Sequence, residues 1–518
     1  MRATMSHSNM KVPNTITRLL PVVVAAVILL FSGSTQASVP GIKGPTFALT
    51  ASESYTTQPD GVMIYSWGYG CSTSTPIVPS IIVGNCNGMQ IPGPTLIVTE
   101  GDTVTVTLTN KLPALAGNTS IVFPGFQVTT AAGTTPPQGL LAAEAAPGGT
   151  VTYTFIASTP GTHAYYSGTQ PDLQIEMGLY GALVVLPKSP IATCVKNANS
   201  GPSYGLAASA YDQTNAVNAA LPNTCYDREY LLQLAEMDSR IHQQADAQVH
   251  CSGASCPTAI NVAIEPYHPR YFLINGRSMP DDMDTNFAPP YPHQPYNGNP
   301  HMHPGDQVLL RIIGQGRYQH PLHEHGNHVR ILARDGNLLL SQTDPGSSAG
   351  PLVFTTTTTP GVAIDGIFYW SGRGLNWDIY DHTPGDGSTC TPDSNGYNTM
   401  KVPPTGINVP ANYYEWCADH NKPLETANGG PTTLPDPSIL TDGLWFGGSA
   451  YLGLDATHKA MGPTPLPPGF AAQNPNAGFA FMWHSHNERE ITTNDIFPGG
   501  MMMMMIVDAP ATVIDETL

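Results

Sequence analysis

The sequence predicts an all-β protein, and three observations carry this prediction. Charged residues make up only 11% of the 518-residue chain, whereas glycines number 51 and prolines 50. The segments between these turn formers are rich in Thr, Val, Ile and Tyr, which favour strands. A chain of this length exceeds what one hydrophobic core usually supports. An internal repeat of strand-like segments indicates that it forms two β-sandwich domains.

The repeat appears when two halves of the chain are set side by side. The matched segments are 96–110 with 299–313, 120–125 with 321–326, and 162–168 with 480–486. The first match places Gly-Asp at a turn before an alternating strand in both halves. We therefore predict sandwich domains at 45–190 and 226–510, joined by a polar linker at 191–225. Residues 381–470 have little periodicity, and we interpret them as a long loop insertion rather than a third domain.

Residues 1–37 have the pattern of a signal peptide. Arg2, Lys11 and Arg18 precede the apolar run 19–31, and the segment 34–37 offers small residues for cleavage. The apolar run holds about 13 residues, fewer than the roughly 20 that span a bilayer. We expect an extracytoplasmic protein, in the periplasm, at the cell surface or secreted. The alternative is an uncleaved N-terminal membrane anchor.

The eight cysteines agree with export, since all of them follow this segment. An even number of cysteines in an oxidising compartment favours disulfides. We expect nearest neighbours to pair, although spacing leaves other connectivities open. The expected pairs are Cys71–Cys86, Cys194–Cys225, Cys251–Cys256 and Cys390–Cys417.

The net charge narrows the choice of partners. It is −18 for the whole chain and about −21 once the three basic residues of the signal are removed. This charge disfavours nucleic acid and anionic membrane as partners. It suits cations, but solubility alone also explains it.

Two short runs of histidine carry the strongest chemical signal. His484 and His486 flank Ser485, and His323 and His325 flank Glu324. Side chains at i and i+2 of a strand share one face, so each pair can point at one metal ion. Together the two pairs would form a four-imidazole site suited to copper. The alternative is a vestigial site whose histidines hydrogen-bond to each other and to water.

A third histidine pair has a weaker pattern. His301-Met-His303 precedes the second Gly-Asp turn. We interpret it as a solvated loop, with a Cu(I) site or the lining of an entry path as the alternative.

These motifs as a set resemble those of the multicopper oxidases, laccase-like proteins built of cupredoxin domains. The resemblance rests on the two histidine runs together with Ile91–Leu96, Ile274–Arg277 and the Gly-Gly-Met segment at 499–501. It covers most of 45–190 and 226–510 and leaves the 381–470 insertion unmatched. It implies tandem cupredoxin-like Greek-key sandwiches, with copper as the cofactor.

The resemblance also identifies what this chain lacks at a type 1 copper site. Family members hold that copper with a cysteine, two histidines and often a methionine. His320 matches one ligand position and is a candidate fifth ligand. Ser485 and Glu490 stand where the cysteine and the second histidine belong. A serine hydroxyl cannot supply the soft thiolate that a blue copper site needs.

Half of the expected trinuclear-cluster ligands are missing as well. Family members use eight histidines in four His-x-His pairs, of which this chain has two. The resemblance and the internal repeat both place the other two pairs at Val122/Pro124 and Tyr166/Gly168, where no histidine stands. The first domain is therefore expected to carry no metal ligands.

We therefore expect an exported copper-binding protein that holds one or two ions of type 2 or type 3 character and no blue copper. Any activity would be oxidoreductase chemistry on a small reductant or metal ion, or with oxygen, but not ordinary four-copper laccase chemistry. The alternative is a non-catalytic copper-binding or surface structural protein. Related two-domain proteins of the family form trimers, so a homotrimer is a further expectation. The sequence does not give the substrate.

Overall fold

The computed structural model describes residues 39–131, 139–189, 208–211, 224–343, 348–370, 372, 392–394, 396, 448–451, 478–508 and 514. All of them belong to one compact unit, residues 37–518. The predicted signal peptide, most of the 191–225 linker and most of the 381–470 insertion lie outside the described residues. In the described part, no helix is long and apolar enough to cross a membrane.

Two of the expected disulfides are confirmed. Cys71–Cys86 and Cys251–Cys256 are bonded, with S–S distances of 2.07 and 2.05 Å. Cys225 is also in a disulfide. The other three cysteines, at 194, 390 and 417, lie outside the described residues, so the two remaining pairings stay predictions.

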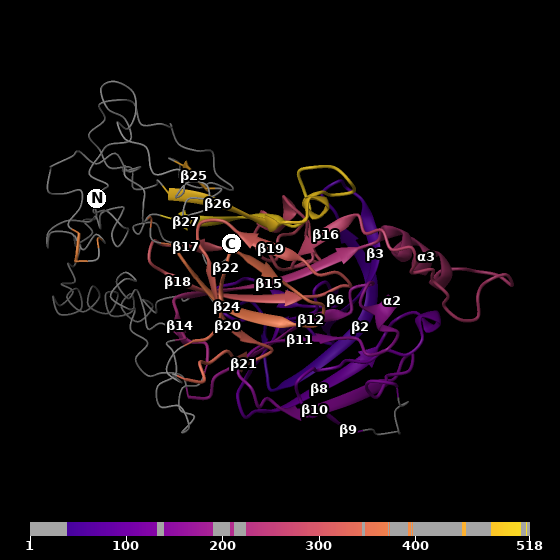
Figure 1. The fold of residues 1–518 in the computed structure, drawn as a ribbon. Coiled ribbons are helices and arrows are strands. Elements are labelled where there is room, and N and C mark those ends of the chain that lie inside the picture. Colours follow the sequence, from indigo (N-terminus) through magenta and orange to yellow (C-terminus); the bar gives the residue numbers. More distant parts are fainter. Residues whose placement is uncertain are drawn as a thin grey trace, which may run out of the picture. The chain divides into compact units, whose positions relative to one another are not determined.

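The all-β prediction is confirmed, and the strands form two pairs of large sheets (Figure 1). In the first pair the strand orders are β1-β7-β12-β11 and β6-β3-β2-β8-β10-β9. Its strands are β1 (Ile42–Lys43), β2 (Thr46–Thr57), β3 (Met63–Cys71), β6 (Met89–Gln90), β7 (Leu96–Thr99), β8 (Thr103–Asn110), β9 (Thr129–Ala131), β10 (Thr150–Ile156), β11 (Gly161–Tyr166) and β12 (Tyr180–Leu186).

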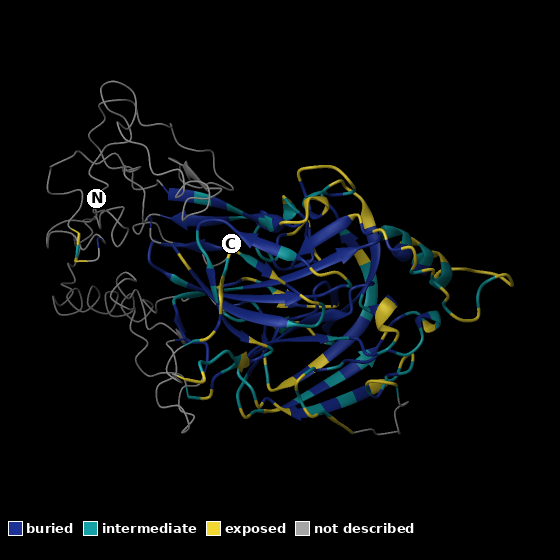
Figure 2. Cartoon of the chain, in the orientation of Figure 1, coloured by how far each residue is buried: buried dark blue, intermediate teal, exposed yellow. Residues whose placement is uncertain are grey.

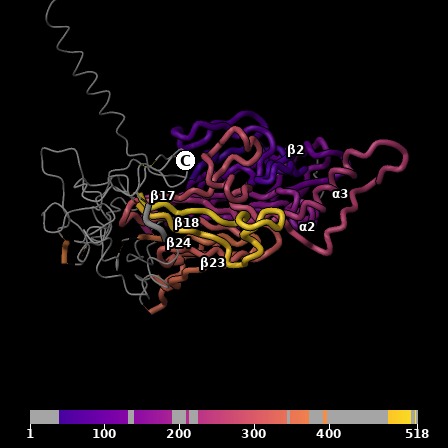
Figure 3. Tube along the Cα trace, turned by 90° about the horizontal axis from the view of Figure 1, so that it is seen from above, coloured from indigo at the N-terminus to yellow at the C-terminus, as the bar shows by residue number. Residues whose placement is uncertain are grey.

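In the second pair the strand orders are β16-β15-β18-β24-β20-β21, with β22 on β20, and β17-β27-β26-β19-β23, with β25 on β26. Its strands are β15 (Arg228–Met237), β16 (Tyr271–Ile274), β17 (His301–Met302), β18 (Gln307–Gly314), β19 (Pro321–Glu324), β20 (Val329–Arg334), β21 (Asn337–Leu338), β22 (Leu352–Val353), β23 (Thr355–Thr357), β24 (Ala363–Tyr369), β25 (Gly448–Tyr451), β26 (Gly478–Ser485) and β27 (Met502–Asp508). In Figure 3 the yellow strands near the C-terminus run beside β17, which pairs with β27 in parallel.

Short elements connect these sheets. They are β4 (Thr75–Pro76), β5 (Asn85–Cys86), β13 (Ala208–Ser209), β14 (Cys225–Tyr226), the helices α2 (Pro171–Gln174) and α3 (Ser239–Val249), and the 3-10 turns η1 (Ala114–Ala116), η2 (Asp281–Met283) and η3 (Glu488–Ile491). Helix α3 is capped by the Asp238 carboxylate, which accepts a hydrogen bond from the Arg240 N–H.

The internal repeat is visible in the strand order. In the first pair β8 lies between parallel β2 and antiparallel β10, and in the second pair β18 lies between parallel β15 and antiparallel β24. Likewise β12 lies between parallel β7 and antiparallel β11, as β27 lies between parallel β17 and antiparallel β26. Equivalent segments of the two halves therefore occupy equivalent places in their sheets.

The two Gly-Asp turns have the same geometry. Gly101 and Gly305 have φ angles of 86° and 82°, which only glycine adopts without strain. The Asp102 carboxylate accepts from the Thr99 N–H at 2.8 Å, and the Asp306 carboxylate accepts from the His303 N–H at 2.9 Å. Each turn therefore starts its strand in the same way.

Burial differs between the two halves because the pairs of sheets pack on each other. Strands β8 and β10 alternate between buried and part-exposed residues, which gives the banding in Figure 2. Strand β18 is buried at all but its first residue. Its Ile313 packs with Ala363 of β24 against Ala164 and Ala182 of the first pair. The sheet that contains β18 is thus covered on both faces.

A buried ion network joins the same surfaces. The Arg311 guanidinium contacts the Glu229 carboxylate at 2.7 and 2.8 Å and donates to the Thr162 hydroxyl of β11 at 3.0 Å. Thr162 donates in turn to Asp365 of β24 at 2.6 Å, and Tyr211 also donates to that carboxylate. The two pairs of sheets are therefore connected by charge as well as by apolar packing.

Candidate metal centre

Strands β19 and β26 bring the two predicted histidine pairs together. The strands are antiparallel, and His323 lies directly opposite His484. Directly opposed residues of an antiparallel pair project their side chains to the same face. Glu324 and Ser485, the residues between the histidines, are each 1% exposed and face the interior. The alternation that the sequence predicted therefore applies to both strands.

The four imidazoles form one cluster. The ring centre of His323 lies 4.7 Å from that of His325, 5.6 Å from His484 and 4.9 Å from His486. The centres of His325 and His484 are 5.0 Å apart, and Nε2 of one lies 3.2 Å from Nε2 of the other. The side chain of His486 is 53% exposed, so the cluster opens to solvent on its side.

Hydrogen bonds around the cluster orient its rings. Nδ1 of His484 donates to the carbonyl oxygen of Ser485 at 2.8 Å, which leaves Nε2 as the basic nitrogen of the neutral ring. Nδ1 of His323 contacts the Thr355 hydroxyl at 2.8 Å and so directs its own Nε2 away from that strand. The Trp483 indole N–H donates to the His325 carbonyl at 2.9 Å and holds the chain just past β19. No sequence pattern indicates the parts played by Thr355 and Trp483.

The surroundings of His323 and His484 favour the neutral form of these two rings. Burial, helped by the neighbouring imidazoles of His484 and His486, lowers the pKa of His323 to about 4. Burial also lowers the pKa of His484. Neutral imidazoles have a free lone pair at physiological pH, which is the form that binds a metal.

This donor set fits a copper ion. Two nitrogens that share an ion at about 2.0–2.1 Å each lie roughly 3 Å apart, close to the 3.2 Å between the Nε2 atoms of His325 and His484. Imidazole is a ligand that copper favours. Within the described residues, no three His, Cys, Asp or Glu side chains have their donor atoms already gathered around one point. A bound ion would therefore need small ring rotations.

His320 lies in a different environment from the four clustered histidines. It is fully buried, Nδ1 contacts the Glu490 carboxylate at 3.0 Å, and Nε2 contacts the Glu236 carboxylate at 2.9 Å. Burial by itself lowers the pKa of His320, but the hydrogen bonds and charges of the two glutamates outweigh it and raise that pKa to about 9. A protonated ring that donates through both nitrogens has no lone pair for a metal.

The residues around His320 do not fit a type 1 copper. The Ser485 hydroxyl donates to Glu490 at 2.5 Å, and the Asn487 amide donates to the other oxygen of Glu490 at 2.9 Å. Glu236 also accepts from the backbone N–H groups of Arg317 and Tyr318. We call Glu236, His320, Ser485 and Glu490 the Glu-His-Glu network. It satisfies its members by hydrogen bonding and contains no thiolate.

The first pair of sheets keeps the geometry of the centre without its ligands. Val122 and Tyr166, the positions that the repeat matches to His323 and His484, form an antiparallel bridge with N–H···O distances of 2.8 and 3.4 Å. A Cβ added to Gly168 would lie 2.7 Å from the Val122 side chain. Strand pairing at these positions is therefore the same in both halves, while the side chains differ.

The interpretation of His301-Met-His303 as a solvated loop is wrong. His301 and Met302 form β17, and His301 and His303 are only 6% and 7% exposed. Nδ1 of His301 contacts the Asp508 carboxylate at 2.7 Å. The proline and Gly-Asp around this motif suggested a loop, but pairing with β27 turns it into an edge strand.

Comparison with known proteins assigns part of the chain. The sequence profile of the multicopper oxidase family matches residues 80–190. The chain is 35% identical over 121 residues to an L-ascorbate oxidase of Brassica rapa subsp. pekinensis, which covers 23% of this chain and 20% of that protein. It is 36% identical over 99 residues to Laccase 1 of Metarhizium acridum, which covers 19% and 15%. The match spans about a fifth or less of the length of these curated relatives.

Solved structures give further matches of lower identity. A blue copper oxidase from Nitrosomonas europaea matches with a TM-score of 0.45 and 17% identity, over 89% of this chain and 85% of that one. A multicopper oxidase called mgLAC matches with a TM-score of 0.44 and 16% identity, over 92% and 88%.

The paired sheets and the imidazole cluster define an all-β protein with a candidate copper centre. The sequence of residues 80–190 matches the multicopper oxidase profile. Residues 80–190 are similar to the multicopper oxidase family.

Proposed function

We propose that this chain is a copper-binding member of the family that holds one or two copper ions through His323, His325, His484 and His486. The observation that supports this most directly is the cross-strand register, which sets His323 opposite His484 and leaves two Nε2 atoms 3.2 Å apart. In this proposal His320 is not a ligand, because both of its ring nitrogens are engaged by carboxylates.

Copper bound here would supply one-electron redox chemistry. The chain's own contribution is to hold four imidazoles together beside β19 and β26. Thr355 and the Ser485 carbonyl keep two of the rings oriented. The exposed side of His486 gives a small reductant, or oxygen, a route to the cluster. With no thiolate in the donor set, the centre should resemble type 2 or type 3 copper and not a blue site.

A non-catalytic copper-binding protein is the second candidate. The Glu-His-Glu network favours it, since this network stands where relatives are expected to hold the copper that accepts electrons. Copper binding without oxygen consumption in the presence of a reductant would select this candidate over an oxidoreductase.

Three further features belong to the proposal. We infer two cupredoxin-like domains at 45–190 and 226–510, in line with sheets drawn from residues 42–186 and 228–508. We infer export, from the predicted signal peptide at 1–37. A homotrimer is the expected assembly, and light scattering of the purified protein tests it.

Copper titration of the metal-free protein tests the site. Wild type should bind one or two equivalents, with a type 2-like paramagnetic resonance signal and no intense blue colour. The double variant His484→Ala, His486→Ala should lose this binding. His250→Ala is the matched control, because His250 is a half-exposed histidine outside the cluster. Equal binding by wild type and the double variant would refute the proposal.

A further inference from the structure

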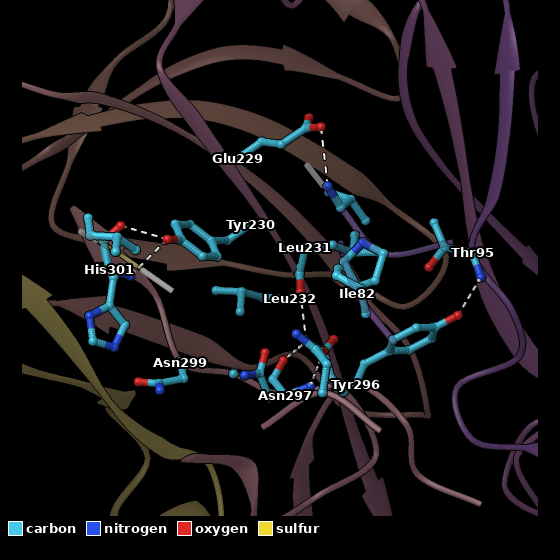
Figure 4. Close-up of a pocket in the computed structure, with 16 residues that line it drawn as sticks. Ile82, Thr95, Glu229, Tyr230, Leu231, Leu232, Tyr296, Asn297, Asn299 and His301 are labelled. Carbon is cyan, nitrogen blue, oxygen red and sulfur yellow. Dashed lines mark hydrogen bonds between the residues drawn. The ribbon is translucent and has the colours of Figure 1, made fainter. Parts of the chain in front are cut away.

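A cavity of about 40 Å³ lies between the two pairs of sheets. Figure 4 shows Leu231 and Leu232 of β15 between Thr95 on one side and Asn299 and His301 on the other. We call this space the Asn299 cavity. On β27, the partner of His301 is Ile506 and the partner of His484 is Met502. Four residues of strand separate them, or about 13 Å at roughly 3.3 Å per residue, so the cavity is separate from the histidine cluster.

Buried polar atoms with no hydrogen-bond partner among the described residues gather in this cavity. They are both amide atoms of Asn299, the Thr95 hydroxyl, Nε2 of His301 and the Asn297 amide nitrogen. Asn299, Thr95 and His301 are 2%, 0% and 6% exposed. Buried polar side chains in native proteins almost always have a hydrogen-bond partner, because leaving one unmet costs free energy. Four such residues around one cavity point to a polar ligand.

The two walls differ in chemistry. Ile82, Leu231 and Leu232 line the cavity with aliphatic residues, the two leucines from opposite faces of β15. The polar wall mixes donors and acceptors: the Asn299 amide provides one of each, and the Thr95 hydroxyl can act as either. Nδ1 of His301 contacts the Asp508 carboxylate at 2.7 Å, so Nε2 is the ring nitrogen left to meet a ligand.

The charged groups around the cavity disfavour an ionic ligand. Glu229, the carboxylate that lines the cavity, is held by Arg311 at 2.7 Å and accepts the Val39 N–H at 3.3 Å. An ionic ligand would need a counter-charge in so buried a site. A hydroxyl is the neutral group that both donates and accepts, and so it matches a wall of mixed donors and acceptors.

We propose that the Asn299 cavity binds a small neutral ring compound with adjacent hydroxyl groups, whose apolar face lies against the aliphatic lining and whose hydroxyls contact Asn299, Thr95 and His301. This site is additional to the proposed copper centre and does not depend on it.

Titration of the full-length, metal-free protein with cis-cyclohexane-1,2-diol tests the proposal, with saturation-transfer NMR as the readout. Wild type should bind the diol saturably. Asn299→Leu and Thr95→Val, which keep side-chain size, should each weaken binding about tenfold through the loss of hydrogen bonds. Cyclohexanecarboxylate, a ring of the same size with a charge, should not bind saturably.

Asn261→Leu is the matched control, because Asn261 lies on an exposed loop and its backbone makes the contacts to Gln248. It should bind the diol like wild type. Thermal unfolding of Asn299→Leu checks that the variant folds, and its melting temperature should equal or exceed that of wild type, since an unpaired amide is removed. No saturation by the diol at tens of millimolar, or equal binding by wild type and Asn299→Leu, would mean that ordered water alone fills the cavity and would overturn the proposal.

Discussion

Ser485 lacks the thiolate of the expected cysteine, and it also holds a neighbouring carboxylate. Its hydroxyl donates to Glu490, which also holds His320, so the residues at the expected type 1 position satisfy one another. Restoring a thiolate does not by itself release His320, because Glu236 and Glu490 still occupy both of its nitrogens.

Ser485→Cys alone should therefore give no intense blue colour after copper loading. The new thiolate would face a protonated His320 and a glutamate instead of two neutral imidazoles. Absorption and paramagnetic resonance spectra of the copper-loaded variant measure this. Wild type loaded in parallel is the control, and a strong blue band in the single variant would contradict the prediction.

The protonation of His320 predicts how stability depends on pH. The pKa of His320 in the folded protein is raised to about 9, above the usual value of about 6.5. A raised pKa stabilises the fold fully below pH 6.5, and this contribution is lost as pH rises through about 9. The loss should be roughly 3 kcal/mol. Urea unfolding at pH 6 to 9.5 measures it, and Glu490→Gln should flatten the profile; an unchanged profile in that variant would count against the network.

At the scale of the element, the centre depends on neighbours that orient its ligands. Thr355 lies on β23, opposite His323 of β19, and its hydroxyl contacts Nδ1 of that ring. Thr355→Val keeps the shape and removes the contact. Copper affinity should fall by about tenfold or more, as is usual when such a partner is lost.

Thr357→Val is the control for this prediction, since Thr357 lies two residues further along β23 and is exposed. Isothermal titration with copper compares the two variants. If both bind copper as tightly as wild type, Thr355 does not orient His323.

Part of this centre was predictable from sequence, and the limit is physical. The i, i+2 spacing of the histidines fixes their common face within each strand, and the repeat matched each strand to its counterpart in the first half of the chain. Glu236 could not be foreseen, because it lies 84 residues before His320 and meets it only through β15. The loop interpretation of His301 is wrong because nothing local in the sequence shows that β27 pairs with it. Local sequence patterns predict which side chains share a face of a strand. Contacts between strands that are distant in sequence can be seen only in the folded structure.

For the whole molecule, the buried Arg311 network holds the two pairs of sheets together. Arg311→Met leaves Glu229 and Asp365 buried without their cation. Such a loss should cost about 3–5 kcal/mol of unfolding free energy, because an uncompensated buried charge remains. Urea denaturation measures this.

Arg270→Met is the control for Arg311→Met. The Arg270 side chain is 54% exposed and pairs with Asp495 at 3.6 Å, and an exposed pair of this kind contributes about 1 kcal/mol or less. Similar unfolding free energies for the two variants would show that the network adds little to the contact between the pairs of sheets.

The bridge between Val122 and Tyr166 makes the first pair of sheets a scaffold for protein design. Both positions are partly exposed, and their backbones already pair as those of His323 and His484 do. Histidines introduced at these two positions would face each other without any change to the main chain. A second imidazole pair could therefore be introduced by substitution into the first pair of sheets, which has no histidine at these positions.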